Sequence, residues 1–246
     1  MFRVEFRQYL QTVLNRIEPL LVSRWRSLLG VLLGVALPLL VFQLLAVEVW
    51  RTQAGLPWDV AVLMAVHSQS RPDLDHVAVI LTGLGTRWGV FPASVGIGLV
   101  LLGRRRWRSL LYWSVTLLGC GWINRLAKTL IHRVRPALWQ SPQPELDFAF
   151  PSGHAMSSMT FVVALVIVLT GNRWQRLVGV LGGLFVVAIG WTRLYLGVHF
   201  PSDVLAGWMV ALAWAIGVSL LIRPTQAGPK TLLEPTTEVS DQTSNT

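Results

Sequence analysis

Two long apolar runs meet at Trp191-Thr192-Arg193-Leu194-Tyr195-Leu196-Gly197-Val198-His199-Phe200-Pro201-Ser202-Asp203, where we expect one membrane helix to end and the next to begin. Pro201 suits the first position of a helix, because its missing N–H would be unpaired there anyway. Asp203 then falls in the first turn, where the helix dipole favours a negative side chain. His199 lies one turn earlier, and a neighbouring carboxylate fixes the tautomer of an imidazole and stabilises the imidazolium. The alternative is that these residues only cap the helix and anchor it among lipid headgroups.

The composition of the chain is that of a membrane protein. Of its 246 residues, 53% are hydrophobic and 13% are charged, whereas soluble domains carry about 25% charged residues. The net charge of +9 could indicate a nucleic-acid partner, but the arginines cluster beside apolar runs, as membrane orientation requires. We therefore expect a lipid bilayer and no nucleic acid as the partner. The single cysteine, Cys120, excludes an intramolecular disulfide.

Six apolar runs predict an all-α bundle of six transmembrane helices, although the second run is short for a span. The predicted spans are 27–47, 88–102, 109–126, 153–170, 177–191 and 202–222. The second span is expected to borrow residues from 77 onward, and 48–87 to form a loop with one or two short interfacial helices. Outside the 27–222 domain, 1–26 is predicted to be a cytoplasmic amphipathic segment, and 223–246 to be a disordered cytoplasmic tail.

The distribution of lysine and arginine predicts the orientation. Most of these residues fall before the first span, in 104–108, in 173–176 and after 222. Because cytoplasmic segments carry the excess of positive charge, both termini are expected in the cytoplasm of a bacterial-type plasma (inner) membrane. The end of the third span, the start of the fourth and the junction of the fifth and sixth then share the extracytoplasmic face.

The first polar cluster at this face follows the third span. Lys128 and Arg135 are seven positions apart, so on a continuous helix they would project from one face. Pro136 disfavours helix at Arg135, however. The alternative is that these are two cations that extend from a helix end toward the headgroups.

The second polar cluster opens the fourth span. Ser152 can cap this helix, and Gly153 lets a ligand approach the backbone, where exposed N–H groups attract anions. His154 could donate a proton to a leaving group. The alternative is an ordinary serine cap beside an interfacial histidine.

Together the clusters suit a phosphate group. Arginines and backbone N–H groups bind its oxygens, while one histidine could attack phosphorus and the other protonate the leaving oxygen. Asp203 is the only carboxylate in the three clusters, too few for a hard cation. Zinc could take His154 and His199, but this would leave the arginines unexplained. No metal and no cofactor are therefore expected.

Three motifs resemble the signature of the type 2 phosphatidic acid phosphatase superfamily, in its membrane lipid phosphatase branch. They are Lys128-x6-Arg135-Pro136, Pro151-Ser152-Gly153-His154 and Thr192-Arg193-x5-His199-x3-Asp203. The resemblance covers roughly 75–222. One departure is visible, because the third motif usually opens with serine and here opens with Thr192, which keeps a hydroxyl.

The resemblance implies roles for the matching residues. His199 would be the nucleophile that forms a phosphohistidine, Asp203 would orient it, and His154 would protonate the leaving oxygen. The phosphate and its transition-state charge would be bound by Lys128, Arg135, Ser152, Gly153 and Arg193. His132 and Arg133 occupy variable positions of the first motif and are interpreted as loop residues.

The expected substrate is a phosphorylated membrane lipid, either phosphatidic acid or phosphatidylglycerophosphate. One alternative is a phosphatase for undecaprenyl or another isoprenyl diphosphate. Another is a protein that binds or transports anionic lipids without chemistry, but such a protein would not need His199 paired with Asp203. The oligomeric state is not predicted.

Overall fold

The computed structural model describes residue 25 and residues 28–53 and 55–224, and this part of the chain consists of helices and the loops between them, without a strand. The all-α prediction is therefore confirmed for the described residues. Of the predicted amphipathic segment 1–26 only Trp25 is described, and of the predicted tail 223–246 only Arg223 and Pro224, so both predictions lie almost wholly outside the described residues.

The first long helix, Leu28–Thr52, contains a short π-helical stretch (η1, Leu32–Ala36) followed by α2 (Leu37–Thr52). Two shorter helices follow, and the remaining five helices account for most of the bundle. Their bounds are α3 Asp59–His67, α4 Pro72–Leu84, α5 Val90–Gly103, α6 Trp107–Ile131, α7 Gly153–Val168, α8 Gln175–Tyr195 and α9 Pro201–Ile222.

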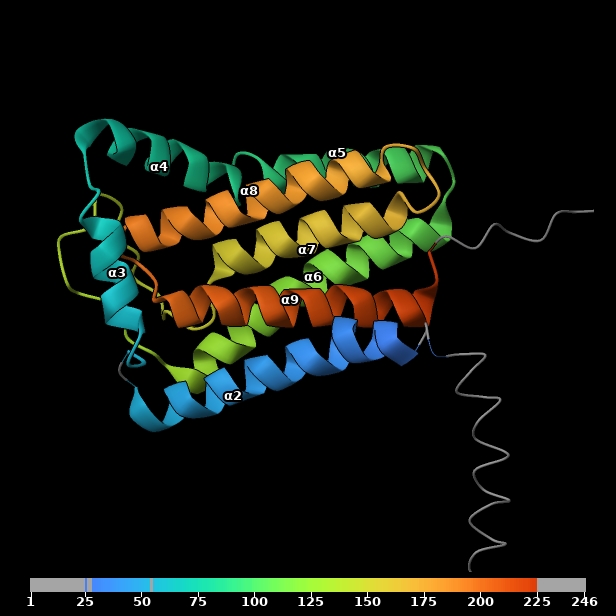
Figure 1. Ribbon diagram of the computed structural model, residues 1–246. Coiled ribbons are helices and arrows are strands. Elements are labelled where there is room, and N and C mark those ends of the chain that lie inside the picture. The colour runs from blue at the N-terminus through green and yellow to red at the C-terminus, as the bar shows by residue number, and fades with distance from the viewer. Residues whose placement is uncertain (1–24, 26–27, 54, 225–246) are drawn as a thin grey trace, which may run out of the picture.

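The long helices run side by side, with α7 and α9 packed against each other inside the bundle (Figure 1). Helix α7 also packs against α6 and α8, and α9 packs against α2 and α6. Helices α4 and α5 follow one another along the outside, where α4 lies against α8 and α5 lies against α6. The start of α7 and the start of α9 therefore come together at one end of the bundle.

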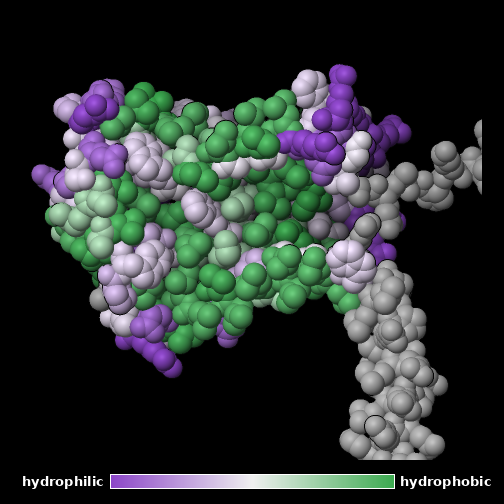
Figure 2. Space-filling view, in the orientation of Figure 1, coloured by the Kyte–Doolittle hydropathy of each residue, from purple (hydrophilic) through white to green (hydrophobic). Residues whose placement is uncertain are grey.

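The flanks of the bundle are apolar. Large hydrophobic side chains such as Ile80, Leu118 and Leu184 are exposed there, and Figure 2 shows a hydrophobic band between two ends where hydrophilic side chains gather. Such an extended apolar surface fits a bilayer and would be a liability in water. Among the described residues, three helices are long and apolar enough to cross a membrane: Leu28–Thr52, α8 and α9. Helices α5 and α7 are apolar but shorter, so the count of six spans stays a prediction.

The second predicted span is not one helix continuing from residue 77. Helix α4 ends at Leu84 and α5 begins at Val90. Gly89 lies in the break, where a Cβ would come within 2.3 Å of the carbonyl oxygen of Leu84, so a side chain does not fit. The segment 48–87 does hold two helices, α3 and α4, and α3 crosses the same end of the bundle as the starts of α7 and α9 (Figure 1). The described chain begins and ends at the opposite end.

Candidate active site

The loop after α6 brings the first cluster to the site. Helix α6 ends at Ile131, and His132 caps it in the left-handed conformation with φ 53°. Lys128 and Arg135 therefore do not project from one helical face, as a continuous helix would require. They converge through a shared partner, because both side chains donate to the carboxylate of Asp147.

The turn between α8 and α9 positions the histidine–aspartate pair. Gly197 adopts φ +66° and packs under the indole of Trp139, whose Cε2 would lie 2.5 Å from an added Cβ. Pro201 opens α9 and Asp203 falls in its first turn, as predicted. One oxygen of Asp203, Oδ2, accepts a hydrogen bond from the N–H of Phe200 at 2.8 Å and lies 3.5 Å from Nδ1 of His199.

His199 is completely buried, and its surroundings favour the neutral ring. Burial lowers its pKa well below the ordinary 6.5, and the charges of Arg135 and Arg193 lower it further. Nη1 of Arg135 lies 2.9 Å from Nε2 of His199. Because a guanidinium only donates, this contact places the lone pair on Nε2 and the proton on Nδ1. Nδ1 makes no hydrogen bond within the described residues and lies closest to the carboxylate of Asp203, at 3.5 Å.

The second cluster starts α7, but Ser152 does not cap it as expected. Ser152 occupies the N-cap position without a side-chain capping bond, and its buried hydroxyl has no hydrogen-bond partner among the described residues. Its N–H donates to the carbonyl of Asp203 at 3.1 Å, which joins the starts of α7 and α9. Gly153 comes next, and the Nε2 of His154 lies 3.3 Å from the hydroxyl of Thr86.

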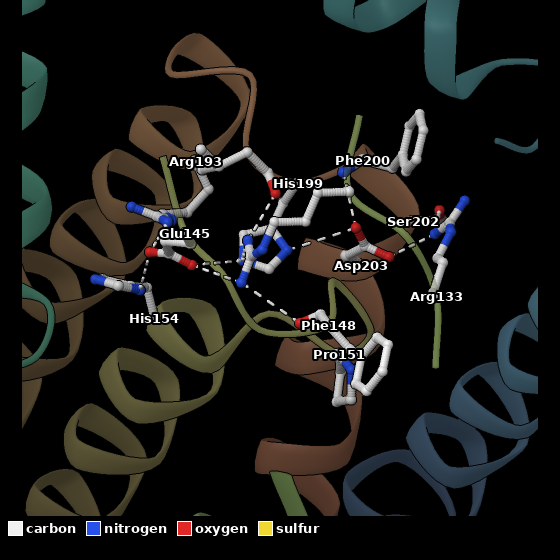
Figure 3. A network of polar contacts seen from close by, with 12 residues as sticks. Arg133, Glu145, Phe148, Pro151, His154, Arg193, His199, Phe200, Ser202 and Asp203 are labelled. Carbon is white, nitrogen blue, oxygen red and sulfur yellow. Dashed lines mark hydrogen bonds and ion pairs between the residues drawn. The ribbon is translucent and has the colours of Figure 1, made fainter. Parts of the chain in front are cut away.

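A carboxylate from the loop before α7 lies among the clusters (Figure 3). Glu145 accepts a hydrogen bond from Nη2 of Arg193 and forms an ion pair with Nη2 of Arg135 at 2.6 Å. Its oxygens lie 3.8 Å from Nδ1 of His154 and 3.9 Å from Nε2 of His199. Two arginines and two histidines thus surround a single oxyanion. Arg193 is itself buried, and its Nη1 donates to Thr82 at 2.7 Å.

The same loop supplies a second carboxylate. Burial raises the pKa of Asp147, but hydrogen bonds from Lys128 and Arg135 outweigh it and leave the pKa below the ordinary 3.8. Glu145 and Asp147 together compensate all three cations of the predicted phosphate site. Sequence reasoning missed both residues. Two acidic side chains in the short loop between the first two motifs could have indicated partners for the cations of the site.

Sequence reasoning also missed Arg133 and Asp59. Arg133 lies in the loop after α6, as expected, but it is completely buried. It donates to Asp203 and, at 2.9 Å, to Asp59 in the first turn of α3. Two features of the sequence could have indicated them. Arg133 lies two residues before Arg135, and Asp59 is the single acidic residue at the start of a short apolar helix.

An apolar cavity of about 840 Å³ adjoins the polar site. It lies between α5, α6 and α7, is lined by side chains such as Phe91 and Met156, and reaches Thr86 and Gly153. A second pocket, of about 580 Å³, is lined by Arg87, Glu145 and His154 among others, and shares Thr86 and Arg87 with the first. The pocket beside the polar site thus adjoins the apolar one.

The geometry favours an anion over a metal. Within residues 25, 28–53 and 55–224, no three His, Cys, Asp or Glu side chains are placed to hold a metal ion. The carboxylate of Glu145 is instead paired with the cations Arg135 and Arg193, while Lys128 pairs with the neighbouring carboxylate of Asp147. Such a set can bind a tetrahedral oxyanion, with a neutral imidazole nitrogen aimed at it.

Comparison with known proteins agrees with this geometry. The family model described as the PAP2 superfamily matches residues 109–226, which contain all three motifs. Phosphatidylglycerophosphatase B of Bacillus subtilis is 31% identical over 181 residues, covering 71% of this chain and 88% of that protein. Undecaprenyl-diphosphatase of Sulfolobus acidocaldarius is 36% identical over 92 residues, 37% of this chain and 41% of that protein.

A solved structure extends the similarity to the whole bundle. The crystal structure of a transmembrane PAP2 type phosphatidylglycerolphosphate phosphatase from Bacillus subtilis superposes with a TM-score of 0.70 at 28% identity. The match covers 78% of this chain and 98% of that one.

Proposed function

The chain belongs to the PAP2 superfamily and is a membrane phosphatase, and we propose that it hydrolyses a lipid phosphomonoester, phosphatidate or phosphatidylglycerophosphate, at the end of the bundle where α7 and α9 begin. The observation that carries this proposal is the carboxylate of Glu145, held by Arg135 and Arg193 between His154 and His199. A substrate phosphate that displaced this carboxylate would meet the same two arginines and lie beside both histidines. The position suits attack by one ring and proton donation by the other.

The proposed reaction has two steps. In the first, Nε2 of His199 forms a bond to phosphorus while the bond from phosphorus to the lipid oxygen breaks, and His154 donates a proton to that oxygen. In the second, water attacks phosphorus and gives a proton to His154, the bond between phosphorus and Nε2 breaks, and phosphate leaves as Nε2 regains its lone pair. Asp203 stabilises the positive charge that develops on His199. No metal takes part in either step.

The phosphate-binding groups act on the charge of the transferring phosphoryl. Lys128, Arg135 and Arg193 supply positive charge, and the N–H groups at the start of α7, including that of Gly153, point toward an anion at the helix N-terminus. The buried hydroxyl of Ser152 has no partner in the described part of the chain and is available to a phosphate oxygen.

The apolar cavity supports a lipid as the carrier of the phosphate. It begins beside Thr86 and Gly153, next to His154, and continues between α5, α6 and α7 into the part of the bundle with apolar flanks. An acyl chain in this space could remain in an apolar environment while the headgroup reached the polar site. The similarity to phosphatidylglycerophosphatase B extends over most of both chains, which favours a phosphomonoester of this kind.

An isoprenyl diphosphate is the second candidate substrate. The similarity to an undecaprenyl-diphosphatase is higher in identity, 36%, but covers only 92 residues. Both substrates end in a phosphoryl group with a lipid tail, so the polar site alone does not discriminate between them. A protein that only binds anionic lipids is less consistent with the site, because binding does not need a neutral imidazole nitrogen beside the anion.

The orientation that we propose keeps both termini in the cytoplasm and the site on the extracytoplasmic face of a plasma membrane. The described chain begins and ends at the end of the bundle opposite the site (Figure 1). Together with the positive charge expected on cytoplasmic segments, this arrangement supports a site on the outer side.

The decisive experiment is phosphate release by the purified protein from phosphatidate, phosphatidylglycerophosphate and an isoprenyl diphosphate, each with and without a chelator. We expect turnover of the phosphomonoesters, inhibition by vanadate and no effect of the chelator. His199→Ala is the matched control. Release no faster than in this variant would favour the binding protein, and activity that a chelator abolishes and magnesium restores would contradict the metal-free mechanism.

A further inference from the structure

Three charged side chains are completely buried behind the histidine–aspartate pair. Asp59, Arg133 and Asp203 come from α3, the loop after α6 and the first turn of α9, and none of the three is exposed. Burying charges costs free energy unless they are paired and hydrogen-bonded. One guanidinium here serves two carboxylates, so the geometry of this group is tightly specified.

Arg133 fixes the orientation of Asp203. Its Nη1 donates to Oδ1 of Asp203 and, at 2.8 Å, to the hydroxyl of Ser202. The other oxygen, Oδ2, accepts from the N–H of Phe200 and faces Nδ1 of His199 (Figure 3). Each oxygen of Asp203 is therefore engaged on a different side, and rotation of the carboxylate would break both sets of contacts.

Asp59 in turn fixes Arg133 and the start of α9. Its Oδ2 accepts from Nη2 of Arg133 at 2.9 Å and from the hydroxyl of Ser202 at 2.6 Å. Its Oδ1 accepts from the N–H of Ser202 at 2.9 Å. The N–H of Leu56, just before α3, also donates to Oδ2 of Asp59 at 2.8 Å, which holds the carboxylate at the start of α3. The ring of Phe200 covers the guanidinium at 4.3 Å.

We propose that Asp59 and Arg133 are positioning residues for the nucleophile of this phosphatase. Through Asp203 they keep the proton of His199 on Nδ1 and leave the lone pair of Nε2 toward phosphorus. The inference rests on the proposed function of His199. Their contacts lie on the Nδ1 side of the ring, whereas Arg135 and Glu145 lie on the Nε2 side. Loss of either residue should therefore slow the chemical step and leave phosphate binding intact.

Two variants and a control test the proposal. Asp59→Asn keeps the shape and removes one carboxylate, and Arg133→Lys keeps the charge but loses the planar two-sided donor. We expect kcat per active site to fall about 10–100-fold, by analogy with the loss found when the outer partners of a metal-bound histidine are removed. KM and the inhibition constant of vanadate should stay within about twofold of the wild-type values, because the variants keep the phosphate-binding contacts that the ground state and the transition state share. Asp73→Asn, at a side chain that is 70% exposed, should leave all three quantities unchanged.

The split between kcat and KM separates positioning from stability. Active sites are counted by the amount of protein that becomes labelled on His199 with a radioactive substrate phosphate. A purely structural pair would lower this count and the melting temperature while leaving kcat per site as in the wild type, which would overturn the proposal. The proposal would also be overturned if KM rose and vanadate inhibition weakened by the same factor as kcat fell. If Asp59→Asn does not fold, Arg133→Lys tests the proposal, because the lysine in this variant leaves a positive charge beside both Asp59 and Asp203.

A readout independent of turnover distinguishes failure of this inference from failure of the proposed function. In protein labelled with ¹⁵N-histidine, the wild type should show His199 as the neutral tautomer protonated on Nδ1, and Asp59→Asn should shift it toward a mixture. The same shift in a protein that releases no phosphate would contradict the proposed function and support the positioning inference. Wild-type hydrolysis with an unchanged tautomer and unchanged kcat in both variants would contradict the inference alone.

Discussion

At the scale of single residues, the two histidines differ in their surroundings. His199 is completely buried with a carboxylate behind it, whereas the side chain of His154 is 18% exposed and lies 3.3 Å from a threonine hydroxyl. We propose different tasks for the two rings. A nucleophile needs a fixed neutral nitrogen, and a proton donor needs access to the departing group and to water that restores its proton.

The first prediction uses the leaving group to separate these tasks. General acid catalysis contributes about 10²–10⁴-fold, so His154→Ala should lose that much on phosphatidate, whose alkoxide needs a proton. The same variant should keep substantial turnover of a nitrophenyl phosphate, because nitrophenolate leaves without one. His199→Ala should be inactive on both substrates. Equal losses on both substrates in the two variants, with vanadate binding intact, would show that the roles are assigned wrongly.

The second prediction concerns the pH dependence of kcat/KM. Because the folded protein holds the pKa of His199 well below 6.5, protonation should remove the nucleophile only at pH values well below that of a free histidine. The acid limb of kcat/KM should therefore lie below pH 6.5, after correction for the substrate phosphate, titrated separately by ³¹P NMR. An acid limb at or above 6.5 would mean that His199 is not held neutral in the free enzyme.

The third prediction concerns the carboxylate that shares the phosphate site. Glu145 binds Arg135 and Arg193, so an incoming oxyanion competes with it for the same cations. Glu145→Gln removes the competing charge, and vanadate should bind about 5–30-fold more tightly, equivalent to about 1–2 kcal/mol for a partly exposed, charged hydrogen-bonded pair. Asp73→Asn is the control for a general change in charge. Weaker vanadate binding in Glu145→Gln would show that Glu145 organises the cations and does not compete with the anion.

At the scale of helices and loops, regular apolar runs were predictable and their interruptions were not. Pro201 opens α9 as predicted, and α7 begins directly after Ser152, although the hydroxyl of Ser152 does not make the expected capping bond. The break between α4 and α5 depends on the close approach of backbone at Gly89, which hydropathy does not report.

The parts of the site that the sequence missed lie in segments without periodicity. Glu145, Asp147 and Asp59 reach the site through loop and helix placement, which depends on tertiary contacts between residues far apart in the chain. Arg133 shows the same limit, because its position in a loop predicted exposure. Its burial follows from two carboxylates contributed by α3 and α9.

The fourth prediction tests the turn that carries His199. Gly197 has φ +66°, and a Cβ would meet the ring of Trp139, so Gly197→Ala should destabilise the fold by about 1–3 kcal/mol and lower kcat. Gly183→Ala is the matched control, because that glycine lies in α8 with nothing within 4 Å of an added Cβ. The measurements are the melting temperature and kcat per active site. A Gly197→Ala protein as stable and as active as Gly183→Ala would show that the turn tolerates a side chain.

At the scale of the whole molecule, the bundle carries its polar site at one end and the two ends of the described chain at the other. The ends of α6 and α8 and the starts of α7 and α9, which carry the phosphate-binding cations and both histidines, lie at one end, and the described chain begins and ends at the other. An apolar band lies between the two ends (Figure 2). If the bundle crosses a membrane along its long axis, the termini and the site must face opposite compartments. The side on which the site lies then decides which pool of lipid headgroups it can reach.

The last prediction tests this orientation with single cysteines in a Cys120→Ala background, which removes the only native thiol. Gln140 is exposed in the loop between α6 and α7, and Asn172 is exposed between α7 and α8 at the opposite end. In intact cells, Gln140→Cys should react with a membrane-impermeant maleimide, and Asn172→Cys should react only after permeabilisation. Both variants should retain phosphatase activity, which shows that the labelled protein is folded. The reverse pattern would place the site in the cytoplasm, where it would act on lipid phosphates of the inner leaflet, and would contradict the positive-inside interpretation of residues 104–108.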